Sequence, residues 1–184
     1  MAPVTWSRIL VPGHWHELSA ETDMLVLPYM LPANDVKRLS GSAVLLVQSQ
    51  TVGYDGVVDY LPGGVAFYNA AGVHEAATGE LALTLTLARL RSIPDAADGQ
   101  NAGEWRHKRH PGLADKRARY RHRWRGREVV QALPAEHPLW RTTNTLITPP
   151  IGGHTGVMLP RVRKLLKRQI ARMADGQPPL NRGL

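Results

Sequence analysis

The glycine-bearing loop around Val52 and Gly53 is a candidate binding site for a small anion. The loop lies between two apolar runs, residues 43–47 and 65–68. In α/β proteins, ligands bind where strands end and where backbone N–H groups point outward. Gly53 lets an anion approach the backbone closely because glycine has no Cβ. An ordinary tight turn would explain the same residues, so both interpretations stay open.

Metal and disulfide chemistry have little support in the sequence. His14 and His16 are spaced like a pair of metal ligands, but no third ligand is evident and no metal site is predicted. The chain has no cysteine, which excludes disulfides and thiolate ligands and makes a cytoplasmic location the simplest expectation. No run approaches the roughly twenty apolar residues of a membrane span, and no signal-peptide pattern opens the chain. We therefore expect no membrane partner.

The positive charge is concentrated in one part of the sequence. The formal net charge is +8, a value that raises the question of a nucleic-acid partner. Residues 118–127 alternate arginine with other residues and offer no apolar face. The basic character begins earlier, at Arg106, Lys108 and Arg109.

Three interpretations of this basic stretch compete. It is a solvated loop, or a nucleic-acid-binding module over residues 106–127 in which Tyr120 and Trp124 stack on bases while arginines contact phosphates. In the third interpretation, which we prefer, residues 118–131 are translated out of frame. Translation of a GC-rich gene in a shifted reading frame typically produces an arginine-rich sequence. Salt-dependent binding to nucleic acid would identify the second interpretation.

The elements that position the Val52–Gly53 loop follow from apolar patterning. Strands are predicted at residues 9–11, 24–27, 43–47 and 65–68, with Asp35 as the cap of a short helix that ends near Ser40. Unbroken apolar runs of this kind are typical of buried parallel strands. Alternating strands and helices predict an α/β protein with a parallel, doubly wound sheet.

Two longer helices are expected. The leucines of residues 76–90 alternate with a strand-like period, but the length of the segment favours a helix that is apolar on two faces and needs cover from more than one side. At the C-terminus, Thr155 is a possible cap, Pro160 suits a first turn, and Gly176 with Pro178 ends the helix. Its predicted apolar face consists of Val162, Leu165, Leu166, Ile170 and Met173. Its basic residues are expected to face solvent.

Several motifs, in this order, resemble those of the D-isomer-specific 2-hydroxyacid dehydrogenases. The resemblance covers roughly residues 24–115 and 133–181 of this sequence. Each motif is moderately specific, and their common order is the stronger signal. They are LPYM at 27–30, TVGYDG at 51–56, NAAGVH at 69–74 with ELA at 80–82, LPAEHPLW at 133–140 and LITPPIGG at 146–153.

The resemblance implies both a binding site and a missing domain. It implies that the backbone N–H groups of Val52 and Gly53 bind the carboxylate of a 2-hydroxy or 2-keto acid, and that the helix at residues 76–91 links this part to a cofactor domain. That domain binds NAD or NADP in the family. Here no two glycines are separated by a single residue, so G-x-G-x-x-G does not occur. The residues between Arg117 and Leu133 fill about half of one βαβ unit, and no bound cofactor is expected.

The catalytic set implied by the resemblance is also incomplete. The family's histidine after Thr-Pro is matched by Pro150, which has no titratable group. Residues 130–132 replace the acidic residue expected before Leu133, and the segment that carries the arginine is absent. His154, Glu136 and His137 are weak substitutes. No catalytic residue is therefore predicted.

These observations predict an α/β flavodoxin-like half-domain with a parallel sheet, a long linking helix and a returning C-terminal amphipathic helix. Residues 1–92 would form the substrate part with the linking helix. Residues 93–132 would be a basic irregular segment in place of the cofactor domain, and residues 133–184 would return to pack on the substrate part. The expected function is that of a truncated, inactive NAD-dependent D-2-hydroxyacid dehydrogenase, and the alternative is the basic module at 106–127. Expected partners are a weakly bound 2-hydroxy or 2-keto acid and other chains that associate through the uncovered apolar helix.

Overall fold

The chain divides into two compact units. The computed structural model describes residues 9–10, 22–29, 31–54, 56–114, 134–142, 145–149 and 151–183. The first unit contains the described residues up to Glu75 and those from Gly156 onward, and the second contains the described residues between Ala76 and Thr155. Residues 118–131, the pair His14 and His16, and Pro150 lie outside the described residues.

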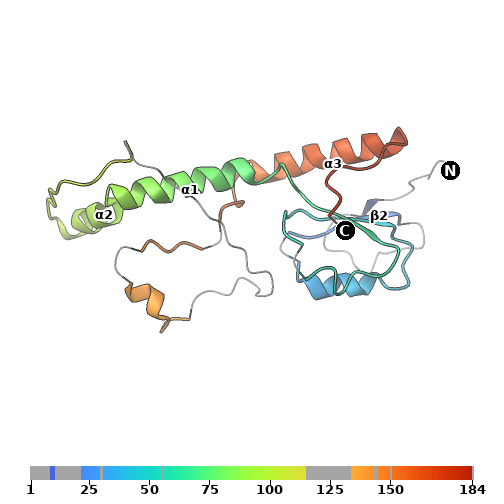
Figure 1. Ribbon diagram of the computed structural model, residues 1–184, viewed down its shortest axis with the longest axis horizontal. Helices are drawn as coiled ribbons and strands as arrows, with labels where there is room; N and C mark the ends of the chain where they lie inside the picture. Colours follow the sequence, from blue (N-terminus) through green and yellow to red (C-terminus); the bar gives the residue numbers. More distant parts are fainter. Residues whose placement is uncertain are drawn as a thin grey trace. The chain divides into compact units, whose positions relative to one another are not determined.

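The first unit is built on a parallel sheet (Figure 1). Its four strands are β1 (Ile9–Leu10), β2 (Met24–Val26), β3 (Leu46–Gln48) and β4 (Ala66–Tyr68), and they lie side by side in chain order. Leu25 pairs with Val47, which in turn pairs with Phe67. The strand order contains no reversal, which is what one half of a doubly wound sheet shows. The predicted α/β fold class with a parallel sheet is confirmed.

Both faces of the sheet are covered. Leu25 and Val47 point to one face, where Val36 and Leu39 of the 3-10 helix η2 (Ala33–Leu39) pack on them. Met24 and Leu46 point to the other face, where they contact Met173 of α3 (Met158–Ala174). Figure 1 shows η2 and α3 on opposite sides of the sheet. Parallel strands need cover on both faces, and this is why their sequences are unbroken apolar runs.

Two predicted details of this unit are wrong. The short helix begins at Ala33 after Pro32, so Asp35 lies in its first turn and is not its cap. The strand predicted at 43–47 is shifted to Leu46–Gln48, because Leu45 is exposed whereas Gln48 is buried and its side-chain amide is satisfied internally.

The predicted C-terminal helix is confirmed as α3, but its buried face differs from the predicted one at one position. Pro160 lies in the first turn, and Gly176 follows the last turn with a φ of +68° that favours glycine. The residue that precedes the helix is Val157, so Thr155 is not the cap. Ile170 is 41% exposed, and the neighbouring Gln169 is fully buried in its place.

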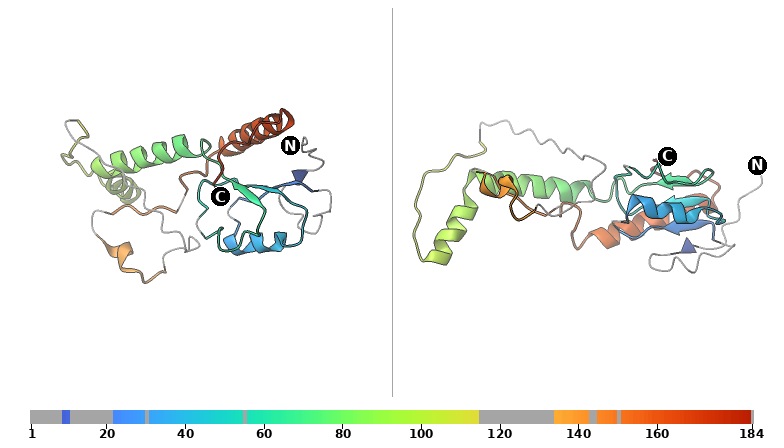
Figure 2. Two further views of the ribbon diagram at one scale, coloured as in Figure 1. Left: turned by 45° about the vertical axis from the view of Figure 1, so that its right-hand side comes forward. Right: turned by 90° about the horizontal axis from the view of Figure 1, so that it is seen from below.

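The second unit contains α1 (Glu75–Leu90) from Ala76 onward, α2 (Ile93–Ala102) and the short 3-10 helix η3 (Pro138–Arg141). Figure 2 shows that α2 leaves the end of α1 at a steep angle. Helix α2 lies in a stretch that was expected to be irregular; Pro94 at its N-terminus and Asp95 in its first turn favour a helix start. Residues 145–148 form no strand.

Helix α1 leaves much of its apolar surface uncovered. Ala77 is its one buried residue, while Leu83 is 52% and Leu87 40% exposed. Exposed apolar helix faces promote association. The protein is therefore expected to bind a hydrophobic dye such as ANS and to elute at a larger apparent size as its concentration rises.

Replacing Leu83 and Leu87 together by glutamine should reduce both the dye fluorescence and the association. Thr84→Gln changes an exposed polar position of the same helix and is the matched control. A sharp monomer peak at high concentration with no dye binding in the unaltered protein would contradict this expectation.

Candidate functional site

The candidate site lies at the edge of the first unit where three strands end. The segment after β2 contributes Tyr29, the segment after β3 contributes Gln50 to Gly53, and the segment after β4 leads to His74. Val52 and Gly53 are exposed. Among the hydrogen bonds between described residues, neither of their backbone N–H groups donates one. The assignment of an anion site to Val52 and Gly53 stays a prediction.

Short hydrogen bonds hold this loop on both sides. The backbone N–H of Thr51 donates to the Ser49 hydroxyl oxygen at 3.0 Å, and the Thr51 hydroxyl donates to the Gly53 carbonyl oxygen at 3.2 Å. The Thr51 carbonyl oxygen accepts a 2.9 Å bond from the backbone N–H of Ala70 in the loop after β4. A loop held in this way presents its free N–H groups with little loss of freedom on binding, which is the condition for preorganised recognition.

Gln50 links the loop to its neighbours. Its side-chain Nε2 donates to the Leu27 carbonyl oxygen at 2.8 Å, and its own carbonyl oxygen lies 2.7 Å from Nε2 of His74. The His74 ring is buried and lies 6.0 Å from the Tyr29 ring, centroid to centroid. Burial raises the pKa of Tyr29, so its hydroxyl stays protonated at neutral pH.

A carboxylate and a guanidinium flank the same edge. Burial raises the pKa of Glu75, but hydrogen bonds from the backbone N–H groups of Gly72, Glu75 and His74 outweigh it, and the pKa lies below its usual value. The Gly72 bond is 2.7 Å long. Arg161 of α3 donates to the Val73 carbonyl oxygen at 3.2 Å. Because Glu75 is ionised and engaged by backbone donors, it stabilises the start of α1 and is not a free base.

Sequence reasoning missed the contributions of Gln50, His74 and Arg161. His74 belongs to the motif at residues 69–74, but nothing in that motif indicates a bond to a residue 24 positions earlier. Arg161 is one of the basic residues of the C-terminal helix, which the sequence places toward solvent, and its bond to Val73 spans 88 positions. Such contacts become visible only once the strand ends are brought together.

The candidate catalytic substitutes lie in the second unit. His137 uses its Nδ1 to accept a 3.2 Å hydrogen bond from the backbone N–H of Leu139 and so caps η3. Glu136 and His154 are exposed. Pro150 falls outside the described residues.

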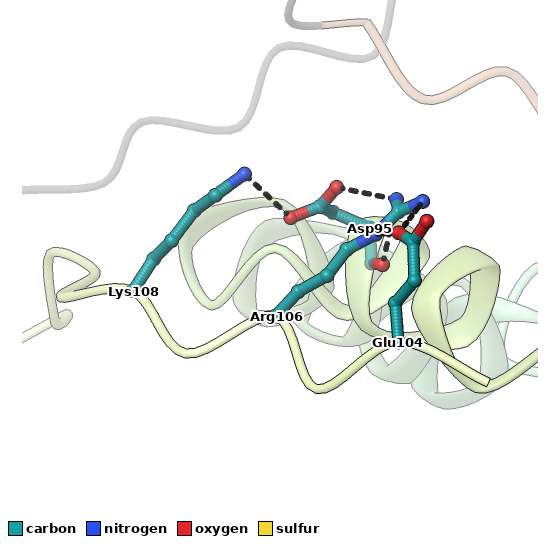
Figure 3. A network of polar contacts seen from close by, with 4 residues as sticks. All are labelled: Asp95, Glu104, Arg106 and Lys108. Carbon is teal, nitrogen blue, oxygen red and sulfur yellow. Dashed lines mark hydrogen bonds and ion pairs between the residues drawn. The ribbon is translucent and has the colours of Figure 1, made fainter. Parts of the chain in front are cut away.

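The start of the basic segment is engaged in ion pairs (Figure 3). Arg106 contacts Asp95 at 3.0 Å and Glu104 at 2.8 Å, and Lys108 contacts Asp95 at 3.2 Å. Hydrogen bonds from Lys108 and Arg106 lower the pKa of Asp95, and bonds to Glu104 and Asp95 raise that of Arg106. Two of the first three basic residues thus hold residues 104–108 against α2, and their charge is compensated within the chain.

The described ranges carry neither a metal-binding cluster nor a membrane-spanning helix. There, no group of three His, Asp or Glu side chains gathers as a metal ion would require. None of the helices in the same residues combines the length and the apolar character of a membrane crossing.

A parallel sheet covered by helices on both faces defines an α/β fold, and its strand order is consistent with a flavodoxin-like half-domain. Neither a protein-family model nor a curated protein matches this sequence. Solved structures do share the fold. A D-isomer-specific 2-hydroxyacid dehydrogenase family protein from Aeromonas salmonicida has a TM-score of 0.69 at 15% identity, with 92% of this chain and 87% of that chain covered.

Two more dehydrogenase structures share the fold. A D-isomer-specific 2-hydroxyacid dehydrogenase from Xanthobacter autotrophicus, in complex with NADPH and MES, has a TM-score of 0.60 at 15% identity, with 90% of this chain and 84% of that chain covered. A dehydrogenase from Rhizobium meliloti has a TM-score of 0.59 at 14% identity, with coverages of 94% and 89%. The resemblance inferred from the motifs is confirmed as a shared fold.

The expectation that no cofactor binds needs correction. The Xanthobacter protein, which shares this fold, is in complex with NADPH. The expectation rested on the absence of G-x-G-x-x-G from the sequence. That pattern describes how closely a backbone turn approaches a pyrophosphate, and its absence does not decide whether a protein of this fold accepts a dinucleotide.

Proposed function

We propose that this chain is the substrate-side part of a D-2-hydroxyacid dehydrogenase and that it binds the carboxylate of a small 2-hydroxy or 2-keto acid at Val52 and Gly53. The observation that carries the proposal is the pair of exposed backbone N–H groups, unused by the described residues, at the end of β3. The shared fold of the dehydrogenase structures supports it. We place the protein in the cytoplasm, in keeping with its lack of cysteine.

The proposal includes a truncation. The residues between Arg117 and Leu133 stand in place of the family's cofactor domain and are about half as long as one βαβ unit. We keep the division at residues 92 and 132 as part of this proposal. With Pro150 in place of the histidine, the chain is a dehydrogenase remnant that does not turn over substrate.

Binding of the acid is expected to be weak. Each hydrogen bond to a charged group contributes about 1.5–3 kcal/mol, and two such bonds must also offset the loss of the ligand's freedom. A dissociation constant on the order of millimolar corresponds to about −4 kcal/mol. The site therefore recognises the carboxylate without holding it tightly.

The test is a titration with pyruvate followed by ¹H–¹⁵N correlation spectra. The amide signals of Val52 and Gly53 should shift together, and pyruvamide, which has no carboxylate, should leave them in place. Gly53→Pro removes one N–H donor and should weaken binding, whereas Gly53→Ala keeps the donor and is the matched control. Pyruvate binding that leaves both amide signals unmoved would contradict the assignment.

No specific observation favours the alternative of a nucleic-acid-binding module at residues 106–127. Its first arginine and its first lysine are paired with Asp95 and Glu104. The stretch that contains Tyr120 and Trp124 lies outside the described residues.

A further inference from the structure

His74 is buried at the start of α1, beside the loop that carries the proposed anion site. The residue is 9% exposed, and its Nε2 lies 2.7 Å from the Gln50 carbonyl oxygen. A carbonyl oxygen only accepts hydrogen bonds, so Nε2 must carry the hydrogen and donate it. This contact fixes the tautomer of the ring.

The other ring nitrogen has no partner among the described residues. With the hydrogen on Nε2, the Nδ1 atom of an uncharged ring is an acceptor. It is buried, and within the part of the chain that the structure describes no donor reaches it. Buried polar atoms without a partner are rare in proteins and call for an explanation. Among the described residues, the ring therefore makes its one hydrogen bond through Nε2, to the loop.

The bond to Gln50 acts on the peptide group that leads into the loop. The Gln50 carbonyl and the Thr51 N–H belong to the same planar peptide, so fixing one fixes the other. The carbonyl accepts from His74 at 2.7 Å, and the Thr51 N–H donates to the Ser49 hydroxyl at 3.0 Å. The Gln50 side chain holds the same residue to Leu27 from the other side at 2.8 Å. The next two peptide groups present the free N–H groups of Val52 and Gly53.

We propose that His74 is a positioning residue: its Nε2–H fixes the Gln50–Thr51 peptide and thereby directs the backbone N–H groups of Val52 and Gly53 toward a bound carboxylate. The inference rests on the proposed function of the loop for its ligand. The positioning itself can be measured without any ligand, because hydrogen exchange and the state of the His74 ring report on it directly.

Three variants separate positioning from bulk stability. His74→Leu removes the donor and fills a similar space, and His74→Gln offers a side-chain N–H to the same carbonyl. Val36→Ala creates a cavity in the core cluster that η2 shares with the sheet, leaves the hydrogen bonds that hold the loop in place, and controls for general loss of stability. In the unaltered protein, ¹⁵N spectra should show His74 protonated at Nε2 and bare at Nδ1.

His74→Leu should weaken pyruvate binding about tenfold, the equivalent of one hydrogen bond, and should speed amide exchange at Val52 and Gly53. His74→Gln should recover most of both effects. Val36→Ala should leave the binding and the local exchange near those of the unaltered protein.

A His74 ring protonated at Nδ1 alone would overturn the proposal even if no variant folded. So would loop exchange in His74→Leu equal to that in Val36→Ala. If pyruvate does not bind at all, the proposed function fails, while the ring tautomer and the exchange data still decide the positioning.

Discussion

Replacing Gln169 by leucine is expected to destabilise the first unit by about 3 kcal/mol, because it leaves several buried polar groups without partners. The Gln169 side chain is fully buried and makes three hydrogen bonds. Its Nε2 donates to Oε1 of Gln48 and to the Leu180 carbonyl oxygen, each at 2.8 Å, and its Oε1 accepts from the Leu180 N–H at 2.7 Å.

The size of the effect follows from what these bonds connect. Gln48 belongs to β3, and its Nε2 donates to the Asn69 carbonyl oxygen at 2.9 Å, so one amide pair joins α3 to the ends of two strands. Leu180 begins the tail that runs past β4, where Arg182 forms an antiparallel bridge with Tyr68. Leucine would match the volume of glutamine but could satisfy none of these groups. A loss of this size is a large fraction of the 5–15 kcal/mol that stabilises typical domains.

Urea unfolding followed by circular dichroism measures this loss. The matched control is Ile170→Gln, the neighbouring position, which is 41% exposed and should change the free energy of unfolding by at most about 0.5 kcal/mol. A larger loss from Ile170→Gln than from Gln169→Leu would show that the apolar face predicted from the sequence is the buried one. That result would contradict the network.

Gln169 and Ile170 show which parts of the fold can be predicted from the sequence and which cannot. The strands were found because runs such as Met24–Val26 are apolar throughout, and a parallel sheet buries every such residue. The burial of Gln48 and Gln169 could not be predicted, because each residue on its own is a solvent-facing amide and only their pairing across 121 positions makes burial favourable.

The same limit applies to the site. The position of the Val52–Gly53 loop was predictable from local signals: an apolar run, a glycine and a second apolar run. The groups that hold the loop were not, since His74 lies 24 positions from Gln50 and the two meet only when β3 and β4 pair. Helix α1 shows the converse. Its two apolar faces were evident from the sequence, and Leu83 and Leu87 are exposed in the folded chain.

Under the proposed function, the second large expected effect is that the protein does not turn over substrate, with or without a histidine at position 150. Reduction of a 2-keto acid needs a hydride from NADH or NADPH and a proton delivered to the carbonyl oxygen. A positioned general acid contributes about 10²–10⁴-fold to such a step, and Pro150 has no proton to give. Proximity and orientation supply a further 7–11 kcal/mol or so, and the family's arginine and carboxylate that would orient substrate and acid are not matched in this sequence.

The assay uses the unaltered protein and Pro150→His, with NADH and NADPH each at high concentration and a panel of 2-keto acids. Loss of reduced nicotinamide should match the rate in buffer for both proteins, and a full-length D-2-hydroxyacid dehydrogenase under the same conditions is the positive control. Because both cofactors are supplied in excess, the expectation concerns proton transfer and substrate orientation. Turnover by the unaltered protein would contradict the proposed inactivity. Turnover by Pro150→His alone would show that the rest of the catalytic arrangement is in place and that the proline is the one missing part.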